Sequence, residues 1–326
     1  MTKVDVIVPI YNAEKSLEQT LDALVMQSLD EIRIVCINDG STDRSLSILE
    51  SFKMRYPEKI EIYNKPNGGI AEARNYGLLQ VKAPYFGFVD SDDVVEKTKF
   101  EELFLEAKRT QADLVTCDFY WSYPNYEKLA KDGGYDSKKS LLTRVFATLW
   151  NKLYRTEFIQ SIGIKFPSGY RYEDASFIYK LIPHLNQWAY VEKAFVHYRQ
   201  TQGSITHVHN ERVKDMIFVF EDLIHYYKSS GYYDLYSSEI EYLFIRFFLG
   251  NSFLRTCQIQ DAKDRKFTLE LSYDVLLRNF PNWKINPYMQ NGGLKNLYFK
   301  FMNSFTYWLS SFIFTLYFKV FKQKVF

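Results

Sequence analysis

The sequence has few cysteines, and none of them is placed for a disulfide framework. Cys36, Cys117 and Cys257 lie far apart in the 326 residues, without a Cys-X-X-Cys pair. Cys36 and Cys117 lie in apolar runs of strand type, where a thiol behaves as a small hydrophobic group. This usage argues against a disulfide-stapled fold and favours a reducing, cytoplasmic compartment.

The sequence also lacks an excess of charge and internal repeats, and its start predicts no signal peptide. Lys and Arg number 41 against 39 Asp and Glu, a net charge of +2. Charge therefore gives no support for a nucleic-acid partner or a strongly acidic one. The first residues, MTKVDVIVPIYN, enter a strand pattern at once, with neither the apolar core nor the cleavage site of a signal peptide. The length allows one large domain or two smaller ones.

Strand-type runs alternate with helical patterns over the first 120 residues. Leu17, Leu21, Leu24 and Val25 share one face of the first helical pattern, for which Ser16 is the predicted cap. A second helix, with Leu46, Leu49 and Phe52 on one face, is predicted behind the start signal at 41–43. This order predicts a mostly parallel sheet with helices on both faces. The predicted strands are 4–10, 31–38, 59–64, 85–90 and 112–120.

The second half of the chain is rich in aromatic residues and largely helical in pattern. Residues 121–137 are polar, with Gly and Pro, and predict a loop. Two helices are predicted after residue 210 from apolar residues at i, i+3 and i+4 spacing. Their apolar residues are Val213, Met216, Ile217, Phe220, Ile224 and Tyr227 in the first, and Ile240, Leu243, Phe244, Phe247 and Phe248 in the second.

Three acids follow the fourth predicted strand in the stretch YFGFVDSDDVVEK. Asp90, Asp92 and Asp93 repel one another unless a positive charge lies between them, and such carboxylates suit a hard divalent cation. The alternative is a solvated acidic turn. Asn12 and Asp39 also come just after strands, and ligands bind beyond the carboxyl ends of the strands in such sheets. The acids are therefore predicted to converge on one site.

The segments NDGSTD (38–43) and NKPNGGIAEARNYG (64–77) add groups for an anion. Their glycines allow close backbone approach and leave amide N–H groups for phosphate, while Arg74 supplies a fork of donors. Carboxylates for a metal and donors for phosphate together predict that a metal-bound diphosphate sits at this edge.

These motifs resemble those of family 2 glycosyltransferases with the GT-A fold. The segments VDVIVPIYNAEKSLEQTLDALVMQSL, INDGSTDRS, NGGIAEARNYGL and VDSDD follow one another in the family's order and spacing. The resemblance covers residues 3–205. It implies an α/β fold of GT-A type, with a Rossmann-like, mostly parallel sheet flanked by helices, followed by an α-helical domain at the C-terminus. The predicted domains are 1–208 and 209–326.

The resemblance implies a role for each matching residue of the donor site. Asp39 would accept a hydrogen bond from the N3–H of uracil or thymine. Asp90 resembles the first acid of the DxD motif, near ribose and metal, and Asp92 the second, a direct ligand of Mn²⁺ or Mg²⁺. Asp93 either belongs to this site or caps the next helix. The resemblance also places Pro9, Tyr11 and Glu14 in the nucleotide pocket, and Asn67, Gly68 and Arg74 beside the diphosphate and ribose.

Glu173 and Asp174 open a helical pattern in YRYEDASFIYK. They could suit the helix dipole alone, but the family places an acidic pair here whose Asp acts as the base. Asp174 is therefore the predicted base, and Glu173 its neighbour in the acceptor site. A positioned base contributes about 10²–10⁴-fold to such a transfer. Trp150 and Asn151, in LWNKLYR, lie near the acceptor or serve in packing.

The segment HYRQTQGSIT (197–206) matches the closing part of the family pattern. Arg199 is the predicted partner of the diphosphate. His197, His207 and His209 are expected to be packed or solvated rather than metal ligands. The chain has no Gln-X-X-Arg-Trp motif of the processive members, so one sugar is expected to be transferred per encounter.

Residues 301–318 carry no charge and are rich in aromatics, with lysines on both sides. Six Ser, Thr and Asn residues argue against a membrane-spanning helix. Three alternatives stay open: a helix at a membrane surface with lysines reaching the headgroups, a packing surface for another subunit or protein, and ordinary core.

The motifs and the resemblance together predict an inverting, metal-dependent transferase that moves one sugar from a UDP-sugar to a growing surface glycan. The acceptor would be a lipid-linked oligosaccharide or a glycosylated adhesin protein. The alternatives are a sugar nucleotidyltransferase and a catalytically inactive binding module. The predicted location is the cytoplasm, at the inner face of the membrane if the tail binds lipid, and the C-terminal helices are expected to form a homo-oligomer.

Overall fold

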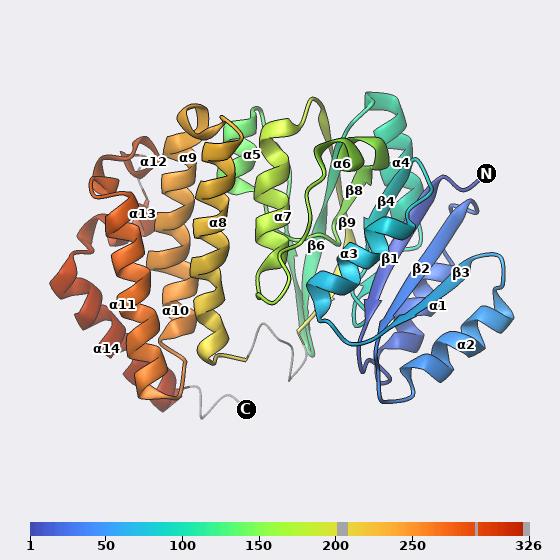
Figure 1. Cartoon of the computed structure of the whole chain (residues 1–326), viewed down its shortest axis with the longest axis horizontal. Coiled ribbons are helices and arrows are strands. Elements are labelled where there is room, and N and C mark those ends of the chain that lie inside the picture. Colours follow the sequence, from blue (N-terminus) through green and yellow to red (C-terminus); the bar gives the residue numbers. More distant parts are fainter. Residues whose placement is uncertain (201–207, 291–292, 322–326) are drawn as a thin grey trace. The chain divides into compact units, whose positions relative to one another are not determined.

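The computed structural model describes residues 1–200, 208–290 and 293–321 (Figure 1). These residues form two compact units. The first comprises 1–138, 145–169 and 173–200, and the second comprises 139–144, 170–172 and the described residues from 208 onward. The domain boundary predicted at residue 208 adjoins a segment outside the described residues and stays a prediction.

The first unit is built on a nine-stranded sheet with the order β3-β2-β1-β4-β8-β6-β9-β5, and β7 pairs with β6. β1 pairs in parallel with β2 and β4, β2 with β3, and β6 with β9, whereas β8, β5 and β7 run antiparallel to their neighbours. The predicted mostly parallel sheet is confirmed. Its strands are β1 (Val4–Ile10), β2 (Ile32–Asp39), β3 (Ile60–Lys65), β4 (Tyr85–Phe88), β5 (Val94–Val95), β6 (Leu114–Tyr123), β7 (Tyr126–Ala130), β8 (Lys152–Arg155) and β9 (Trp188–Arg199).

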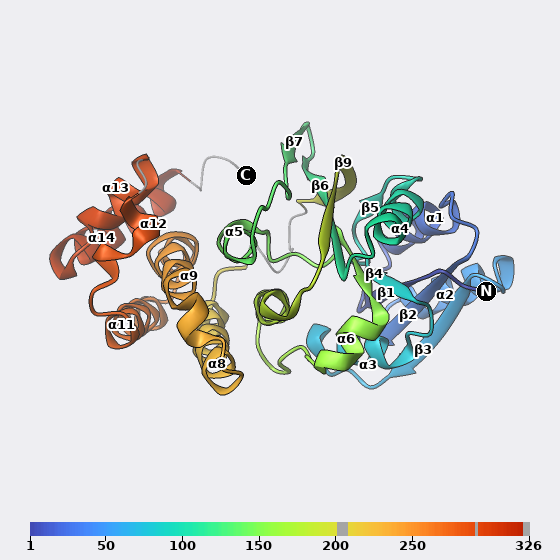
Figure 2. The ribbon, with the colours of Figure 1, turned by 90° about the horizontal axis from the view of Figure 1, so that it is seen from above.

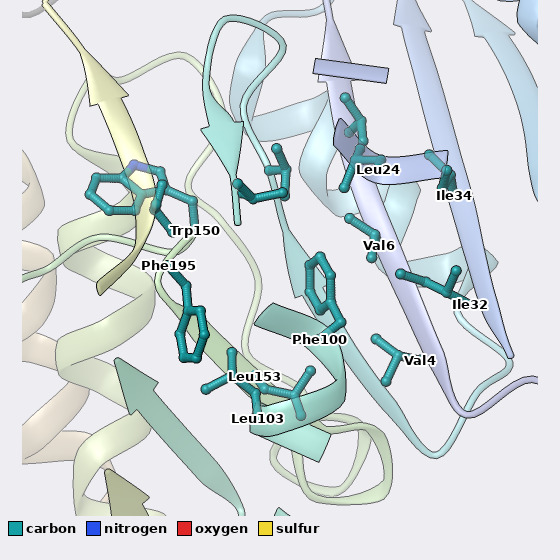
Figure 3. Close-up of a cluster of buried hydrophobic side chains, with 14 of the residues drawn as sticks. Val4, Val6, Leu24, Ile32, Ile34, Phe100, Leu103, Trp150, Leu153 and Phe195 are labelled. Carbon is teal, nitrogen blue, oxygen red and sulfur yellow. The ribbon is translucent and has the colours of Figure 1, made fainter. Parts of the chain in front are cut away.

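Helices cover both faces of this sheet, as the continuous apolar strands predicted. Every residue of β1 and β2 is buried. Val4, Val6 and Leu24 belong to the core between the sheet and the helices α1, α2 and α4 (Figure 3). Figure 2 shows α1 and α4 on one side of the sheet and α3 and α6 on the other. The helices of this unit are α1 (Leu17–Val25), α2 (Ser45–Arg55), α3 (Ile70–Gln80), α4 (Lys99–Thr110), α6 (Thr156–Ile162) and α7 (Glu173–Leu181).

Two local predictions were wrong. The Ser16 side chain does not cap α1, because its hydroxyl donates to the carbonyl of Ser91 at 3.0 Å, a partner far away in the sequence.

The loop predicted over 121–137 contains the end of β6 and all of β7, joined by a tight turn. Tyr123 and Tyr126 stack across this hairpin with ring centroids 4.6 Å apart, and such cross-strand aromatic pairs stabilise a hairpin.

The second unit is helical, as predicted. α8 buries Met216, Phe220 and Ile224, and the Phe220 ring packs on Phe244 of α9 with centroids 5.1 Å apart. No helix within the described ranges is long and apolar enough to cross a membrane. The α-helices are α5 (Lys138–Arg144), α8 (Asp215–Ser229), α9 (Tyr233–Arg246), α10 (Ser252–Thr256), α11 (Ala262–Asn279), α12 (Pro287–Gln290), α13 (Leu294–Phe301) and α14 (Ser304–Phe321).

Candidate active site

The loops that follow β1 and β2 are joined by hydrogen bonds at one edge of the sheet. The amide of Asn12 donates to the Ser41 hydroxyl at 3.1 Å, and the Asn12 side chain accepts from the amide of Thr42 at 2.8 Å. Asn12 has φ of 49°, a left-handed conformation that Asn tolerates. The three residues predicted for the nucleotide pocket lie here: Pro9 is on β1, Tyr11 is exposed, and Glu14 accepts from Arg44 at 3.2 Å.

Asp39 ends β2 and holds the glycine-bearing loop that follows β3. Its buried carboxylate accepts hydrogen bonds from the amides of Gly68 at 3.0 Å and Gly69 at 2.8 Å. Lys65 forms an ion pair with the same carboxylate. The Asn67 side chain donates to the Asp39 carbonyl at 3.0 Å. The structure therefore brings Asp39, Asn67 and Gly68 together, as the motifs predicted. It also places Lys65 at this position. Lys65 lies in the same NKPNGG segment, but the motifs did not single it out.

Arg74 projects from α3 and connects two acidic segments. Its guanidinium donates to Asp90 at 2.9 Å and forms an ion pair with Glu173, ninety-nine residues away. Burial opposes the charge, but Asp90 and Glu173 outweigh burial and raise the pKa of Arg74. Arg74 thus stays charged and joins the turn after β4 to the start of α7. The diphosphate contact predicted for it stays a prediction.

A residue of α1 forms hydrogen bonds with the acidic turn that follows β4. The Thr20 hydroxyl donates to the carbonyls of Ser91 and Asp93, at 3.1 and 2.8 Å. Asp93 is fully buried, and one of its carboxylate oxygens accepts from the amide of Arg199 at 3.0 Å. Helix α4 begins at Lys99, after Thr98. Asp93 therefore does not cap that helix, and the cap alternative was wrong because the carboxylate binds a strand amide instead.

The protein balances the charge of this turn only in part, since Arg74 pairs with Asp90 but Asp92 and Asp93 have no ion-pair partner of this kind in the part of the chain that the structure describes. Burial and the neighbouring Asp90 raise the pKa of Asp92 to about 6, and burial together with Asp90 and Asp92 raises the pKa of Asp93 well above its usual value. The second carboxylate oxygen of Asp93 is buried without a hydrogen-bond partner. Oxygen donors with uncompensated negative charge fit a hard divalent cation. The described residues contain no cluster of three or more His, Cys, Asp or Glu groups arranged around a single ion, so such a cation would need further oxygens from phosphate or water.

Asp174 lies at the start of α7, next to Glu173 and the Arg74 guanidinium. Its carboxylate accepts from the amide of Ala175 at 2.7 Å. Burial, and next the charge of Glu173, raise the pKa of Asp174 to about 7, whereas Arg74 acts in the opposite direction. A carboxylate with a pKa near neutral suits a general base. Distant segments that carry Arg74, Asp90, Glu173 and Asp174 therefore meet at one place.

Comparison with known proteins identifies the family. A family profile described as glycosyl transferase family 2 matches residues 5–170, half of the chain. The chain belongs to this family. The glycosyltransferase EpsJ of Bacillus subtilis, described as uncharacterized, is 32% identical over 218 residues, which are 63% of each chain. The family 2 chain therefore covers less than two thirds of that relative's length.

Solved structures share the fold of this family 2 chain. The S. aureus TarS fragment 1–349 in complex with UDP-GlcNAc aligns with a TM-score of 0.58 and 20% identity, covering 95% of this chain and 79% of that one. The mannosyltransferase PcManGT from Pyrobaculum calidifontis, in complex with GDP-Man and Mn²⁺, aligns with a TM-score of 0.56 and 13% identity, covering 97% of this chain and 87% of that one. The predicted GT-A fold is confirmed.

Two basic residues of β9 lie close to the acidic turn of the family 2 chain. The charge of Arg199 lowers the pKa of Asp92, against the larger effect of burial. His197 contacts Glu96 and Glu127, each at 2.8 Å, and stacks on Tyr120. His197 is thus paired with carboxylates. His207 lies outside the described residues.

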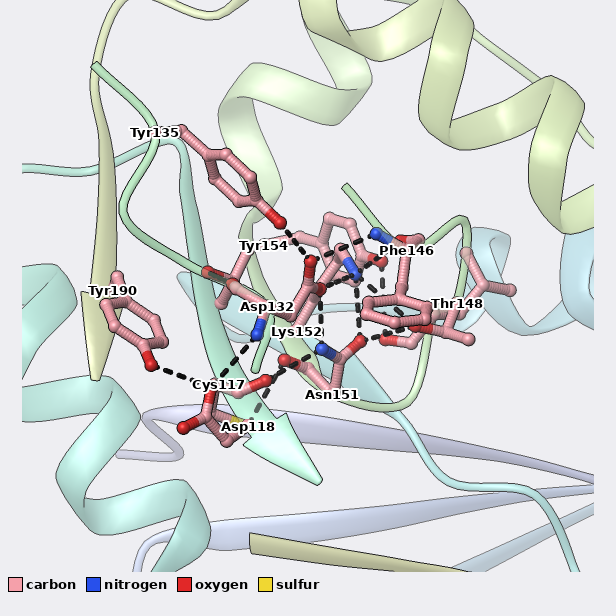
Figure 4. Close-up of polar contacts among 12 residues, drawn as sticks. Cys117, Asp118, Asp132, Tyr135, Phe146, Thr148, Asn151, Lys152, Tyr154 and Tyr190 are labelled. Atoms are coloured by element: carbon pink, nitrogen blue, oxygen red, sulfur yellow. Dashed lines mark hydrogen bonds and ion pairs between the residues drawn. The ribbon is translucent and has the colours of Figure 1, made fainter. Parts of the chain in front are cut away.

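Trp150 and Asn151 are buried, which favours the packing alternative for both. Trp150 stacks on Tyr198 with ring centroids 4.9 Å apart. The Asn151 side chain donates to Asp132 at 2.7 Å, and the fully buried Lys152 ammonium contacts the same carboxylate at 2.8 Å (Figure 4). This network joins the segment after β7 to the start of β8.

Proposed function

We propose that this chain is an inverting, divalent-cation-dependent glycosyltransferase that moves one sugar from a UDP-sugar to a hydroxyl of a growing glycan. The observation that carries the proposal is the meeting of Asp90, Glu173 and Asp174 around the Arg74 guanidinium, beyond the carboxyl ends of the strands. Membership of the family and a structural neighbour that binds UDP-GlcNAc support it.

The donor would lie over the joined loops of β1, β2 and β3. Asp39 and the Gly68 and Gly69 segment would face the uracil and the ribose, with Tyr11 exposed beside them. For the base to reach Asp39, Lys65 must share or release that carboxylate. Arg199 and backbone amides would face the diphosphate, since both supply donors to phosphate oxygens.

The cation, Mn²⁺ or Mg²⁺, would be held by Asp92 with Asp90 beside it. Bound there, the ion would supply charge stabilisation to the departing diphosphate. The raised pKa of Asp92 and the unpartnered oxygen of Asp93 support a cation at this turn, as does the Mn²⁺ complex of PcManGT.

Asp174 would act as the base. As the acceptor oxygen bonds to the anomeric carbon from the face opposite the diphosphate, the Asp174 carboxylate takes the proton of that hydroxyl. The bond from the anomeric carbon to the diphosphate oxygen breaks with its electron pair, which leaves UDP, an inverted glycoside and a protonated Asp174. Glu173 would lie beside the acceptor, and its ion pair with Arg74 holds the start of α7 in place.

The proposed acceptor is a lipid-linked oligosaccharide or a glycosylated adhesin protein on its way to the cell surface, and the proposed location is the cytoplasmic side. A sugar nucleotidyltransferase is the alternative enzyme, but such enzymes open with a Gly-rich basic loop that PIYNAEKS does not resemble. An inactive binding module is the alternative from another class, and intact Asp90, Asp92 and Asp174 argue against it.

The test is a screen of nucleotide sugars with Mn²⁺, with Mg²⁺ and with a chelator. Release of UDP from a UDP-sugar, and its loss on chelation, is the expected result. Release of pyrophosphate from UTP and a sugar phosphate would instead assign a nucleotidyltransferase. Tight UDP binding without turnover over all sugars and acceptor extracts would assign a binding module.

A further inference from the structure

Helix α14 of the second unit has its apolar side turned outward. Phe305 is 74% exposed, Phe312 63% and Ile313 53%. The buried residues of the same helix include Thr306 and Ser311. A surface helix normally directs its apolar stripe to the core. In α14 a second, exposed stripe at helical spacing lies opposite the buried Tyr307, formed by Phe305, Trp308, Leu309, Phe312, Ile313, Leu316, Tyr317, Val320 and Phe321.

The orientation of α14 is set by specific contacts with its own unit. Tyr307 is fully buried, and its hydroxyl donates to the carbonyl of Leu269 at 3.1 Å. The Tyr307 ring stacks on Tyr273 with centroids 4.5 Å apart. Rotating the helix to bury the stripe would break these contacts, so the exposed stripe belongs to the folded unit.

Helix α13 repeats the pattern. Leu294 is 87% exposed, Leu297 65% and Phe301 68%, at i, i+3 and i+7. The opposite side of α13 is anchored by Phe299, which is buried. Two consecutive helices thus expose large apolar side chains, well beyond the scattered exposure that is ordinary for a surface.

We propose that the exposed residues of α13 and α14, which we call the apolar face, bind the surface of an anionic lipid bilayer. Helices α13 and α14 carry three lysines, Lys295, Lys300 and Lys319, and no Asp or Glu. Lys300 and Lys319 lie near the two ends of α14. Apolar and aromatic side chains that enter the boundary between headgroups and acyl chains, with lysines at the phosphates, are typical of helices that lie on a membrane.

The charges distinguish a bilayer from a second copy of this chain. A symmetric dimer through the apolar face would bring the lysines of α13 and α14 toward one another, and neither helix carries an acid to pair with them. An anionic bilayer supplies the missing negative charge. Because no helix of the described ranges can span a membrane, the helices would lie in the surface.

The test is co-sedimentation of the full chain with vesicles of phosphatidylcholine alone and of an equal mixture of phosphatidylcholine and phosphatidylglycerol. We compare the wild type with the triple variant Phe312→Ser, Ile313→Ser, Leu316→Ser. The control carries Leu79→Ser, Leu105→Ser and Leu235→Ser, three exposed leucines outside the apolar face. Circular dichroism and thermal unfolding show whether each variant is folded.

The wild type and the control should sediment with the mixed vesicles. The triple variant should lose at least about tenfold in partitioning, since each removed side chain contributes apolar burial. Lys300→Glu with Lys319→Glu should weaken binding to the mixed vesicles. Retained binding in the triple variant, or no binding by the wild type, overturns the proposal. A wild-type oligomer that the triple variant dissociates, with no vesicle binding, would show that a second copy covers the face.

Discussion

The three aspartates that follow β4 lie in different surroundings. Asp93 is fully buried and bonded to the Arg199 amide, Asp90 is paired with Arg74, and Asp92 is partly exposed. Burial and its acidic neighbours raise the pKa of Asp92 to about 6, which indicates a carboxylate without sufficient compensating charge. Among the three, Asp92 is the one that we propose as the cation ligand.

Asp92→Ala should abolish sugar transfer and cation-dependent UDP binding while the protein stays folded. A bound cation stabilises the leaving group by several kcal/mol, which the variant would lose. The measurement is UDP titration calorimetry and UDP release at limiting Mn²⁺. The control is Asp22→Ala, at an exposed position of α1. Near-normal activity of Asp92→Ala would exclude Asp92 as a ligand.

Asp174→Asn should lower turnover by about 10²-fold or more and leave UDP affinity little changed, because the amide keeps size and polarity but loses basicity. Since the pKa of Asp174 is raised to about 7, wild-type turnover should fall as the pH drops below that value and protonates the base. The turnover of the Asp174→Asn variant should not show this decrease at low pH. A parallel loss of UDP affinity would place Asp174 in the donor site instead.

At the scale of elements, helix α3 lies unusually close to β1 and thereby positions Arg74. A Cβ added at Gly77 would come within 2.5 Å of the Ile7 Cγ2 atom. Gly77 is thus required for close packing of helix on strand, since a real Cβ would force the helix outward.

Gly77→Ala should lower the free energy of unfolding by about 1–3 kcal/mol through overpacking, and should weaken UDP binding if α3 moves. Urea unfolding compares it with Leu79→Ala, an exposed position on the same helix. The double variant that adds Ile7→Ala should lose less stability than the sum of the two single variants, because the shorter side chain leaves room for the added Cβ. Unchanged stability of Gly77→Ala would contradict the close approach.

His197 joins β9 to two other elements, since its ring contacts Glu96 after β5 and Glu127 of β7. Burial lowers the pKa of His197, but the two carboxylates outweigh it and raise the pKa. The stabilisation from these pairs is therefore fully present below the unfolded value of about 6.5 and is lost as the pH rises through the raised pKa.

His197→Gln should accordingly destabilise the protein more at pH 6 than at pH 9, with Tyr120 still packed beside the position. The measurement is the difference in free energy of unfolding between variant and wild type across pH. A difference that stays constant, or that grows with pH, would contradict a protonated His197.

At the scale of the whole molecule, the chain divides into two units with separate interiors. Every residue predicted for the donor and the base lies in the first unit, whereas the apolar face lies in the second. We therefore expect substitutions in the second interior to change stability without changing donor binding.

Tyr307→Ala tests this division. The variant should destabilise the second unit by about 3–5 kcal/mol, the usual range for removing a buried aromatic side chain, because Tyr307 is fully buried and stacked on Tyr273. UDP affinity, measured by calorimetry below the unfolding transition, should stay unchanged. A matching loss of UDP affinity would show that the units do not act separately.

The sequence by itself determined the parts of this protein that depend on local pattern. Strand-type runs identified β1 to β4 and β6, and β1 was predicted at its observed bounds, Val4–Ile10, whereas β9, the parallel partner of β6, was not predicted. Leu17, Leu21, Leu24 and Val25 were predicted to share a face, and all are buried. Acids at strand ends had to meet at one edge, because parallel strands end there.

Only the tertiary structure decided the contacts between segments far apart in the chain. The ion pair of Arg74 with Glu173 and the anchoring of Asp39 by Gly68 and Gly69 depend on how helices and loops pack, which no local pattern encodes. The orientation of α14 likewise depends on packing between segments far apart in the chain. Its composition left three alternatives open, and the burial of Tyr307 against Leu269 and Tyr273 decided which side faces outward. A helix with apolar residues around most of its circumference has no pattern that selects one face, so packing makes the choice.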